Sequence, residues 1–245
     1  MLRRLVLGLA MIGATMPAHA AEEHDLRSGR PGVSQPVFLH PAAHPAVSAV
    51  LFPGGSGAVS AVRGNFLIRA ADEFAAAGIT VAIADAPSDH PGGVDRAFRA
   101  SEAQAIDSAA VVAFLRNRAP LPVWLIGTSN GAISAANAGV RLGPAWIAGV
   151  VLTSSVWIGG MQATDFQTLR LPTLIVHNRN DGCPFSPFDH AAPALASLRN
   201  APAKELIAVS SSASLSGPCE AMSPHGYLGL EKQVVRRIAD WIKTH

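Results

Sequence analysis

The sequence predicts an α/β protein, a three-layer α/β/α sandwich around a mostly parallel central sheet. Short apolar segments alternate along the chain with segments whose apolar residues recur at helical spacing. The short segments are apolar throughout, which is typical of parallel strands that helices cover on both faces. In such sheets the functional groups gather in the loops that follow the carboxyl ends of the strands.

The composition is that of one folded domain. Hydrophobic residues make up 49% of the 245-residue chain and charged residues 15%, which is typical of a globular protein with a large core. The net charge is only +2 and Lys and Arg form no basic stripe, so nucleic acid is not an expected partner. No spacing of His or Cys is that of a metal site, and we expect neither a metal ion nor a cofactor.

Residues 1–20 read as a secretory signal peptide. Two positive charges precede an apolar run over 5–16, and Ala18 and Ala20 form an A-x-A cleavage pattern. We expect cleavage after Ala20; the alternative is an uncleaved anchor. No later segment approaches the roughly 18 apolar residues that a membrane span needs, so the mature protein is expected to be periplasmic or secreted without stable membrane insertion.

The mature chain is expected to form a single domain over 35–245. Residues 21–34 are polar and rich in Gly and Pro, and we interpret them as a leader segment before that domain. The apolar segments expected as strands are 35–41, 46–57 (which runs into a glycine-rich turn), 79–87, 121–127, 147–155, 171–178 and 203–210.

The helices are expected where apolar residues recur every three or four positions. The segment 65–78 places Phe66, Ala70 and Phe74 on one face and ends at Gly78, a residue that favours helix termination. The other segments expected to be helical are 96–118, about 130–142, 188–198 and 227–245.

A G-x-S-x-G pattern marks the end of one predicted strand. Ser129 lies two residues beyond 121–127, at the start of the next helix, between Gly127 and Gly131. A sharp strand-to-helix turn with small flanking residues is typical of a nucleophile elbow. The alternative is a serine that only caps the helix.

In this context the chain resembles the α/β-hydrolase superfamily over about 35–243. It is similar to compact members such as dienelactone-hydrolase-like and esterase-like proteins, which implies the α/β-hydrolase fold without a cap domain. The family orders its triad Ser, acid, His, and Asp181 after strand 171–178 and His225 before the last helix match those places. The resemblance implies that Ser129 is the nucleophile, His225 the base and Asp181 the residue that orients it.

Other assignments remain open for the acid and the histidines. Asp181 could be a turn residue, with Asp165 as the first substitute, and His225 could be an ordinary loop histidine. His177 ends a predicted strand and is interpreted as a structural hydrogen-bonding residue. His190 is expected on the surface of a helix.

The resemblance also implies two backbone N–H groups that form an oxyanion hole. One is that of Asn130, and the other lies in the segment FPGGSG, 52–57, where related enzymes carry His-Gly-Gly. By that match Gly55 is the expected donor and Ser56 the alternate. Pro53 stands where the family more usually has His.

The segment 156–170 is too short for a lid domain. Trp157, Ile158 and Met161 within it are expected to line an open, apolar substrate cleft; the alternative is that they pack at the edge of the core. An open site suits short acyl esters better than long buried lipids.

An even number of cysteines in an exported protein suggests a disulfide between Cys183 and Cys219. The alternative is two separate thiols. In the fold that the resemblance implies, the loops carrying these cysteines meet above the sheet, beside Asp181 and His225.

The expected function is that of an exported serine hydrolase that cleaves carboxylic esters through an acyl-enzyme. The same groups also support peptidase, thioesterase or acyltransferase chemistry. From a different class, the chain could be a non-catalytic binding protein on a hydrolase fold. The expected partner is a small-molecule ester, and the sequence predicts no particular oligomeric state.

Overall fold

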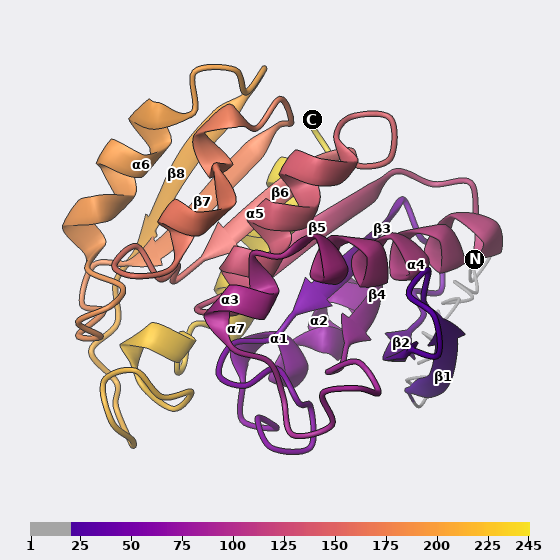
Figure 1. Ribbon diagram of the computed structural model, residues 1–245. Coiled ribbons are helices and arrows are strands. Elements are labelled where there is room, and N and C mark those ends of the chain that lie inside the picture. Colours follow the sequence, from indigo (N-terminus) through magenta and orange to yellow (C-terminus); the bar gives the residue numbers. More distant parts are fainter. Residues whose placement is uncertain (1–20) are drawn as a thin grey trace, which may run out of the picture.

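The computed structural model describes residues 21–245, which form one sheet covered by helices on both faces (Figure 1). Within these residues the sheet has eight strands in the order β1-β2-β4-β3-β5-β6-β7-β8. Neighbouring strands from β4 through β8 pair in parallel, whereas β1 and β2 form an antiparallel extension beside β4. The strands are β1 Glu22–Arg27, β2 Ser34–His40, β3 Val47–Phe52, β4 Ile79–Ala84, β5 Val123–Thr128, β6 Gly149–Thr153, β7 Thr173–Asn178 and β8 Lys204–Val209.

The helices form the two outer layers of the predicted sandwich. In Figure 1, α4 and α5 lie in front of the sheet, and α1, α2 and α7 lie behind it. The helices are α1 Phe66–Arg69, α2 Ala71–Ala76, α3 Arg96–Arg99, α4 Glu102–Arg118, α5 Gly131–Leu142, α6 Ala191–Ser197 and α7 Glu231–Ile242. Short 3₁₀ turns are η1 Met161–Thr164, η2 Phe166–Thr168, η3 Phe188–His190 and η4 Pro224–Gly226. The predicted fold class is confirmed.

Two hydrophobic clusters sandwich the sheet, one on each face. Successive residues of a strand point to opposite faces, so Val50 packs in the cluster with α4, α5 and α6, and Leu51 packs in the cluster with α1, α2 and α7. On the second face Trp124 of β5 meets Trp241 of α7 edge to face, with ring centroids 5.6 Å apart. Burial on both faces explains why the central strands are apolar throughout.

The segment 21–34 is part of the sheet and is not a leader outside the domain. Residues Glu22–Arg27 form β1, which pairs antiparallel with β2 at the edge of the sheet. The strand alternates half-buried and exposed residues and contains only one aliphatic side chain, Leu26. An edge strand is held by backbone hydrogen bonds and needs few apolar side chains. A search for apolar segments therefore does not predict this strand.

Two predicted helices are each divided in the structure. The segment 65–78 forms α1 and α2, which meet at Ala70. The segment 96–118 forms α3 and α4, because Ser101 adopts an extended conformation and its side chain accepts a hydrogen bond from the Gln104 N–H. A serine that caps a new helix in this way ends the preceding one.

The last two predicted helices are shorter than expected. The segment 188–198 begins as the 3₁₀ turn η3 and becomes helical only in α6. The segment 227–245 begins its helix at Glu231, because Tyr227 and Gly229 have φ values of 58° and 77°, in the left-handed region.

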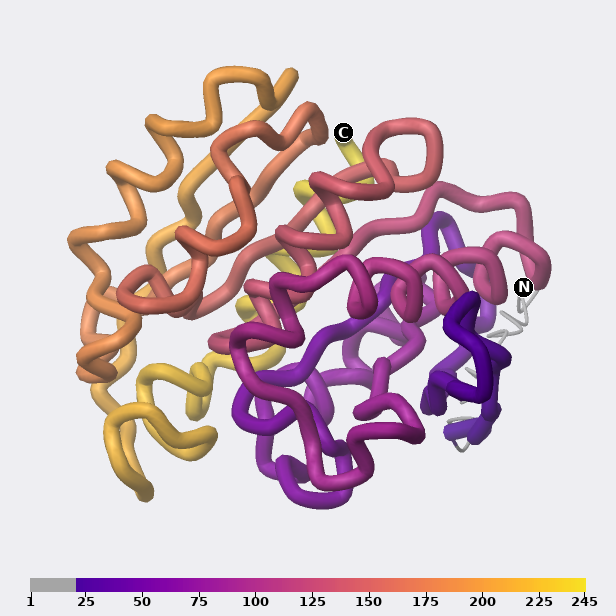
Figure 2. The backbone as a smooth tube through the Cα atoms, viewed as in Figure 1, coloured from indigo at the N-terminus to yellow at the C-terminus, as the bar shows by residue number. Residues whose placement is uncertain are grey.

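Loops far apart in the sequence converge at the carboxyl edge of the sheet. Figure 2 shows the segments 53–65 and 210–226 along the same lower edge of the molecule, where residues of both line one pocket. The predicted signal peptide, residues 1–20, lies outside the described residues. Across residues 21–245, no helix combines the length and apolar character that crossing a bilayer requires.

Candidate active site

Ser129 occupies a strained turn between β5 and α5. Its φ is 54°, in the left-handed region that a side-chain-bearing residue rarely adopts. The turn requires both flanking glycines: a Cβ at Gly127 would overlap the Gly131 carbonyl, and a Cβ at Gly131 would overlap the Phe52 carbonyl. The geometry is that of a nucleophile elbow, with the Ser129 side chain half-buried above the sheet.

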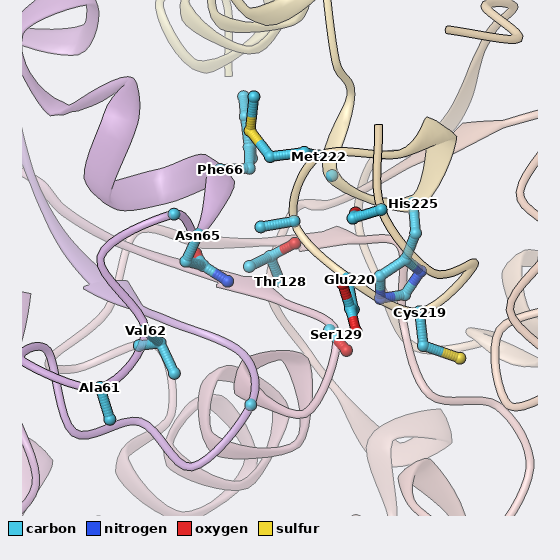
Figure 3. A pocket seen from close by; sticks show the side chains of 15 residues that line it. Ala61, Val62, Asn65, Phe66, Thr128, Ser129, Cys219, Glu220, Met222 and His225 are labelled. Atoms are coloured by element: carbon cyan, nitrogen blue, oxygen red, sulfur yellow. The ribbon is translucent and has the colours of Figure 1, made fainter. Parts of the chain in front are cut away.

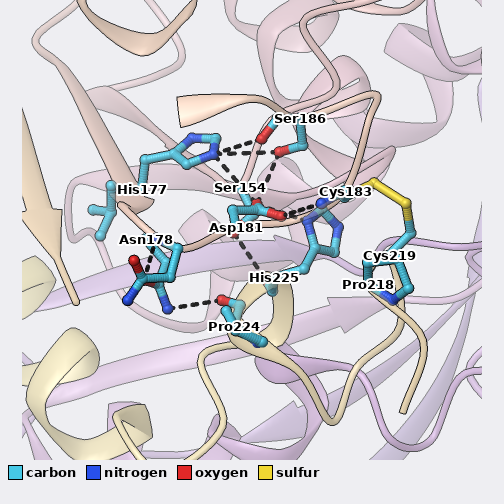
Figure 4. A network of polar contacts seen from close by, with 12 residues as sticks. Ser154, His177, Asn178, Asp181, Cys183, Ser186, Pro218, Cys219, Pro224 and His225 are labelled. Atoms are coloured by element: carbon cyan, nitrogen blue, oxygen red, sulfur yellow. Dashed lines mark hydrogen bonds and ion pairs between the residues drawn. A yellow bond between two sulfur atoms is a disulfide. The ribbon is translucent and has the colours of Figure 1, made fainter. Parts of the chain in front are cut away.

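Asp181 lies in the turn after β7 and is held by several donors (Figure 4). Its Oδ2 accepts hydrogen bonds from His225 Nδ1 at 2.8 Å and from Ser186 Oγ at 3.1 Å. Its Oδ1 accepts from the Cys183 N–H at 3.0 Å. The carboxylate is fully buried, so these contacts fix its orientation.

The protonation of Asp181 follows from two opposing effects. Burial raises the pKa of its carboxyl, but hydrogen bonds from His177, His225 and the Cys183 N–H outweigh burial and hold the pKa at about 2. Asp181 is therefore ionised at any pH at which the protein is expected to work.

His225 lies in the 3₁₀ turn η4 and points toward the pocket that Ser129 lines (Figure 3). Its backbone is anchored at both ends: its N–H donates to Ser223 Oγ, and its carbonyl accepts from Ser154 Oγ at 2.7 Å. Because Nδ1 donates to Asp181, the neutral ring keeps its lone pair on Nε2, which has no hydrogen-bond partner among the described residues. Ser129 Oγ is not hydrogen-bonded to Nε2, and such contacts often tighten only when substrate binds.

His177 is a buried hydrogen-bonding residue near the end of β7, as interpreted from the sequence, and it also joins the Asp181 network, which the sequence did not indicate. Its ring lies fully buried in β7, donates from Nε2 to the Ser186 carbonyl at 2.9 Å and lies 3.3 Å from Asp181 Oδ2. The four-residue spacing from His177 to Asp181 is the only sequence signal for this contact. Ser186 had no signal of its own, because its role depends on the fold of the loop.

The predicted oxyanion donors are placed unequally. Gly55 lines the pocket together with Ser129, whereas Ser56 does not line it. The neighbouring Gly54 approaches so closely that a Cβ there would lie 2.9 Å from Ser129 Cβ. Among residues 21–245, the N–H groups of Gly55 and Asn130 donate to no protein acceptor, and Asn130, unlike Gly55, is not one of the residues that line the pocket.

The pocket beside Ser129 has a volume of about 380 Å³. Figure 3 shows side chains from the segments 61–66 and 219–225 facing each other across it. Its apolar wall consists of Ala61, Val62, Phe66, Ala221 and Met222, and its polar side chains beyond Ser129 and His225 are Asn65, Thr128, Ser216 and Glu220.

The structure does not bring the predicted cleft residues to this pocket. Trp157 and Met161 are buried in the core cluster that packs against α5, where Trp157 also lies against Phe166 and His177. Ile158 is 43% exposed and lies outside the pocket lining. Trp157 and Met161 therefore pack in the core, which was the alternative interpretation of these residues, and Ile158 lies on the surface.

The predicted disulfide between Cys183 and Cys219 is present (Figure 4). It joins the loop that carries Asp181 to the loop that carries His225. The Cys183 N–H binds Asp181, and Cys219 lines the pocket. The bond therefore ties the two halves of the polar network together.

Removal of this bond is expected to lower both stability and activity. The bond joins residues 36 positions apart, and the chain-entropy model assigns such a loop about 4 kcal/mol, with less usual in practice. We expect a lower melting temperature and a several-fold lower kcat in the Cys183→Ser/Cys219→Ser variant. Thermal unfolding and ester hydrolysis at low temperature measure the two effects separately. An unchanged kcat in the folded double variant would limit the bond to a stabilising role.

The described part of the chain holds no cluster of three or more His, Cys, Asp or Glu side chains arranged to bind a metal ion.

Comparison with known proteins finds relatives by structure alone. No protein-family model and no curated protein matches the sequence. An α/β serine hydrolase homologue from Coxiella burnetii is 15% identical, with a TM-score of 0.67 over 91% of this chain and 99% of that one. An α/β serine hydrolase without a lid from Xanthomonas campestris is 19% identical, with a TM-score of 0.63 over 91% and 96%.

An esterase from Pyrococcus furiosus is 12% identical, with a TM-score of 0.69 over 99% of this chain and 96% of that one. These identities are low, and the likeness extends over almost the whole described chain. In the described residues, β6 and β7 are joined only by a short connection with the 3₁₀ turns η1 and η2. The chain therefore has the α/β-hydrolase fold, in its compact form without a lid domain.

Proposed function

We propose that the protein is an exported serine hydrolase that cleaves carboxylic esters through an acyl-enzyme. The observation that carries this proposal is the strained left-handed Ser129 in one pocket with His225; within residues 21–245, His225 Nε2 has no hydrogen-bond partner, while Nδ1 donates to the ionised Asp181. Structures of serine hydrolases and of esterases, one of them with ferulic acid bound, share this fold and support the proposal.

The reaction begins with attack of Ser129 Oγ on the ester carbonyl carbon. His225 Nε2 takes the hydroxyl proton as the new C–O bond forms, and the carbonyl oxygen becomes an oxyanion. The N–H groups of Gly55 and Asn130 stabilise that oxyanion. Collapse of the tetrahedral intermediate breaks the bond to the alcohol, which leaves with the proton returned by His225.

Hydrolysis of the acyl-enzyme repeats these steps with water. His225 removes a proton from the water as it attacks the acyl carbon, and the proton passes to Ser129 Oγ when the acid leaves. Asp181 stays ionised throughout and stabilises the imidazolium that forms in each half-reaction. Its four contacts hold the histidine ring in the tautomer that this cycle requires.

The substrate that fits the pocket is an ester with a short acyl or alcohol group. A volume of about 380 Å³ is near the lower end of small-molecule sites. The pocket opens to solvent beside exposed Glu220, so one end of a larger substrate can project from it.

A panel of p-nitrophenyl esters tests this function. We expect the highest kcat/KM for short acyl chains, and no jump in rate when the substrate passes from monomers to droplets, because no lid domain has to open. A pronounced interfacial activation would contradict the proposed open site. Thioesters, peptides and alcohol acceptors tested alongside separate ester hydrolysis from thioesterase, peptidase and acyltransferase activity. Binding without turnover of any of them would favour the non-catalytic alternative.

Export is part of the same proposal. The N-terminal sequence supports it, and so does the disulfide, because such bonds persist in oxidising compartments. Fractionation of cells that express the full chain, with mass spectrometry of the mature N-terminus, tests for cleavage after Ala20.

A further inference from the structure

Arg99 is a buried cation without a carboxylate partner. It ends the short helix α3, is 3% exposed, and forms no ion pair among the described residues. Its guanidinium instead donates to Ser134 Oγ at 3.1 Å, and to the carbonyls of Pro53 at 3.2 Å and Gly55 at 3.3 Å. Burial of an unpaired charge is unfavourable for folding. A buried Arg99 behind the Ser129 pocket therefore suggests a functional role.

The two carbonyls that Arg99 binds belong to the loop that supplies Gly55. The carbonyl between them, that of Gly54, accepts from the Gly57 N–H at 3.1 Å. Three consecutive peptide groups are therefore fixed by donors. Because each trans peptide is planar, a fixed carbonyl also fixes the N–H on its opposite side. The Gly55 N–H is thus fixed through the Gly54 carbonyl by the Gly57 N–H, and Arg99 holds the peptide groups on either side of it.

The same helix also holds the other side of the site. Arg96 Nε donates to Asn130 Oδ1 at 2.9 Å, and Asn130 Nδ2 donates to the Gly55 carbonyl at 3.2 Å. Arg96 and Arg99 thus act on the two residues that carry the free N–H groups. Glycine at position 57 makes room for this arrangement, since a Cβ there would lie 2.5 Å from Arg99 Nη2.

We propose that Arg99 is a positioning residue of the oxyanion hole, which holds the loop 53–55 in place and keeps a fixed positive charge behind the site of the developing oxyanion. This inference rests on the proposed hydrolase function. A charge in a dry interior stabilises a full negative charge more than it stabilises the neutral ester carbonyl. Its contribution therefore appears in the transition state and not in substrate binding. Burial lowers the pKa of Arg99 to about 10, which leaves it protonated at neutral pH.

The test compares Arg99→Met and Arg99→Lys with the wild type. We expect kcat for p-nitrophenyl acetate to fall about 10- to 100-fold in Arg99→Met, below the roughly 100- to 1000-fold typical of deleting a direct donor, with KM nearly unchanged. The affinity for an alkyl boronic acid, whose serine adduct resembles the tetrahedral intermediate, should fall by a similar factor. Arg99→Lys keeps the charge with fewer donors, and its kcat should lie in between.

Arg30→Met is the matched control. Arg30 is also largely buried, but it binds Asp107 and Asp89 and lies outside the Ser129 pocket. Its replacement should lower the melting temperature and leave kcat and boronic acid affinity unchanged.

Chemical rescue of the Arg99→Ala variant is a further test. Added guanidinium ion, at a concentration that does not denature the protein, should restore kcat several-fold in Arg99→Ala. It should leave the kcat of Arg30→Ala unchanged.

The inference is overturned if Arg99→Met retains kcat within two-fold of the wild type, or if kcat falls while boronic acid affinity does not. If Arg99→Met fails to fold, the comparison of Arg99→Lys with the wild type decides by the same two measurements. These outcomes differ from those expected if the proposed hydrolase function itself is wrong. In that case the wild-type protein would neither hydrolyse esters nor react with a fluorophosphonate at Ser129.

Discussion

Replacement of Ser129 by alanine is expected to lower kcat for ester hydrolysis by about 10⁴- to 10⁶-fold while the protein remains folded. The elbow can accept alanine because the backbone strain at φ 54° is already present, and the lost Oγ makes no hydrogen bond among the described residues. What remains after the substitution is binding and the oxyanion donors, which account for only a small part of such catalysis.

A fluorophosphonate probe checks the same prediction by a direct chemical route. It should label Ser129 in the folded wild type, and peptide mapping should find no adduct in Ser129→Ala. Ser212→Ala is the control, because Ser212 is exposed on a surface loop and should affect neither labelling nor kcat. An adduct at another serine, or a Ser129→Ala variant with wild-type kcat, would contradict the assignment of the nucleophile.

The parts of the fold that were predictable from sequence are those whose signal is local. The buried parallel strands are continuous apolar segments, and the elbow has its two glycines at fixed spacing around Ser129. β1 escaped prediction because an edge strand needs few apolar side chains. The breaks at Ala70 and Ser101 escaped because helical periodicity continues across them; at Ser101 the boundary depends on a side-chain cap, and at Ala70 no side-chain cap marks it.

The residues of the candidate site also differ in how far a local sequence signal predicts them. Ser129, Asp181 and His225 follow from motif and chain order, and the structure brings Asp181 and His225 into contact and places His225 at the Ser129 pocket. The pocket walls come from loops that meet only in three dimensions, so Trp157 and Met161 were assigned to them in place of residues such as Val62 and Met222. A buried positioning residue such as Arg99 has no motif, because its partners are backbone carbonyls.

Asp181→Asn is expected to lower kcat by about 10⁴-fold, a loss typical of replacing the triad acid. The substituted side chain would offer one carbonyl oxygen and an amide, and an amide that faces His225 Nδ1 favours the ring tautomer with its hydrogen on Nε2. That tautomer cannot accept the proton of Ser129. The Cys183 N–H would still donate to the carbonyl oxygen of the asparagine, and Ser186 Oγ can accept from its amide, so KM should change far less than kcat.

The pH dependence of stability gives this substitution a second readout. Since the pKa of Asp181 is lowered from 3.8 to about 2 in the folded protein, its ionised form adds stability above pH 3.8 that is lost as the pH falls through 2. The wild type should therefore exceed Asp181→Asn in free energy of unfolding near neutral pH, and the difference should shrink in acid. Urea unfolding at a series of pH values measures it. Asp165→Asn is the control, because Asp165 makes no side-chain contact with His225, and it should retain wild-type kcat. If Asp165→Asn lost activity while Asp181→Asn kept it, the acid would have to be reassigned despite the 2.8 Å contact between Asp181 and His225.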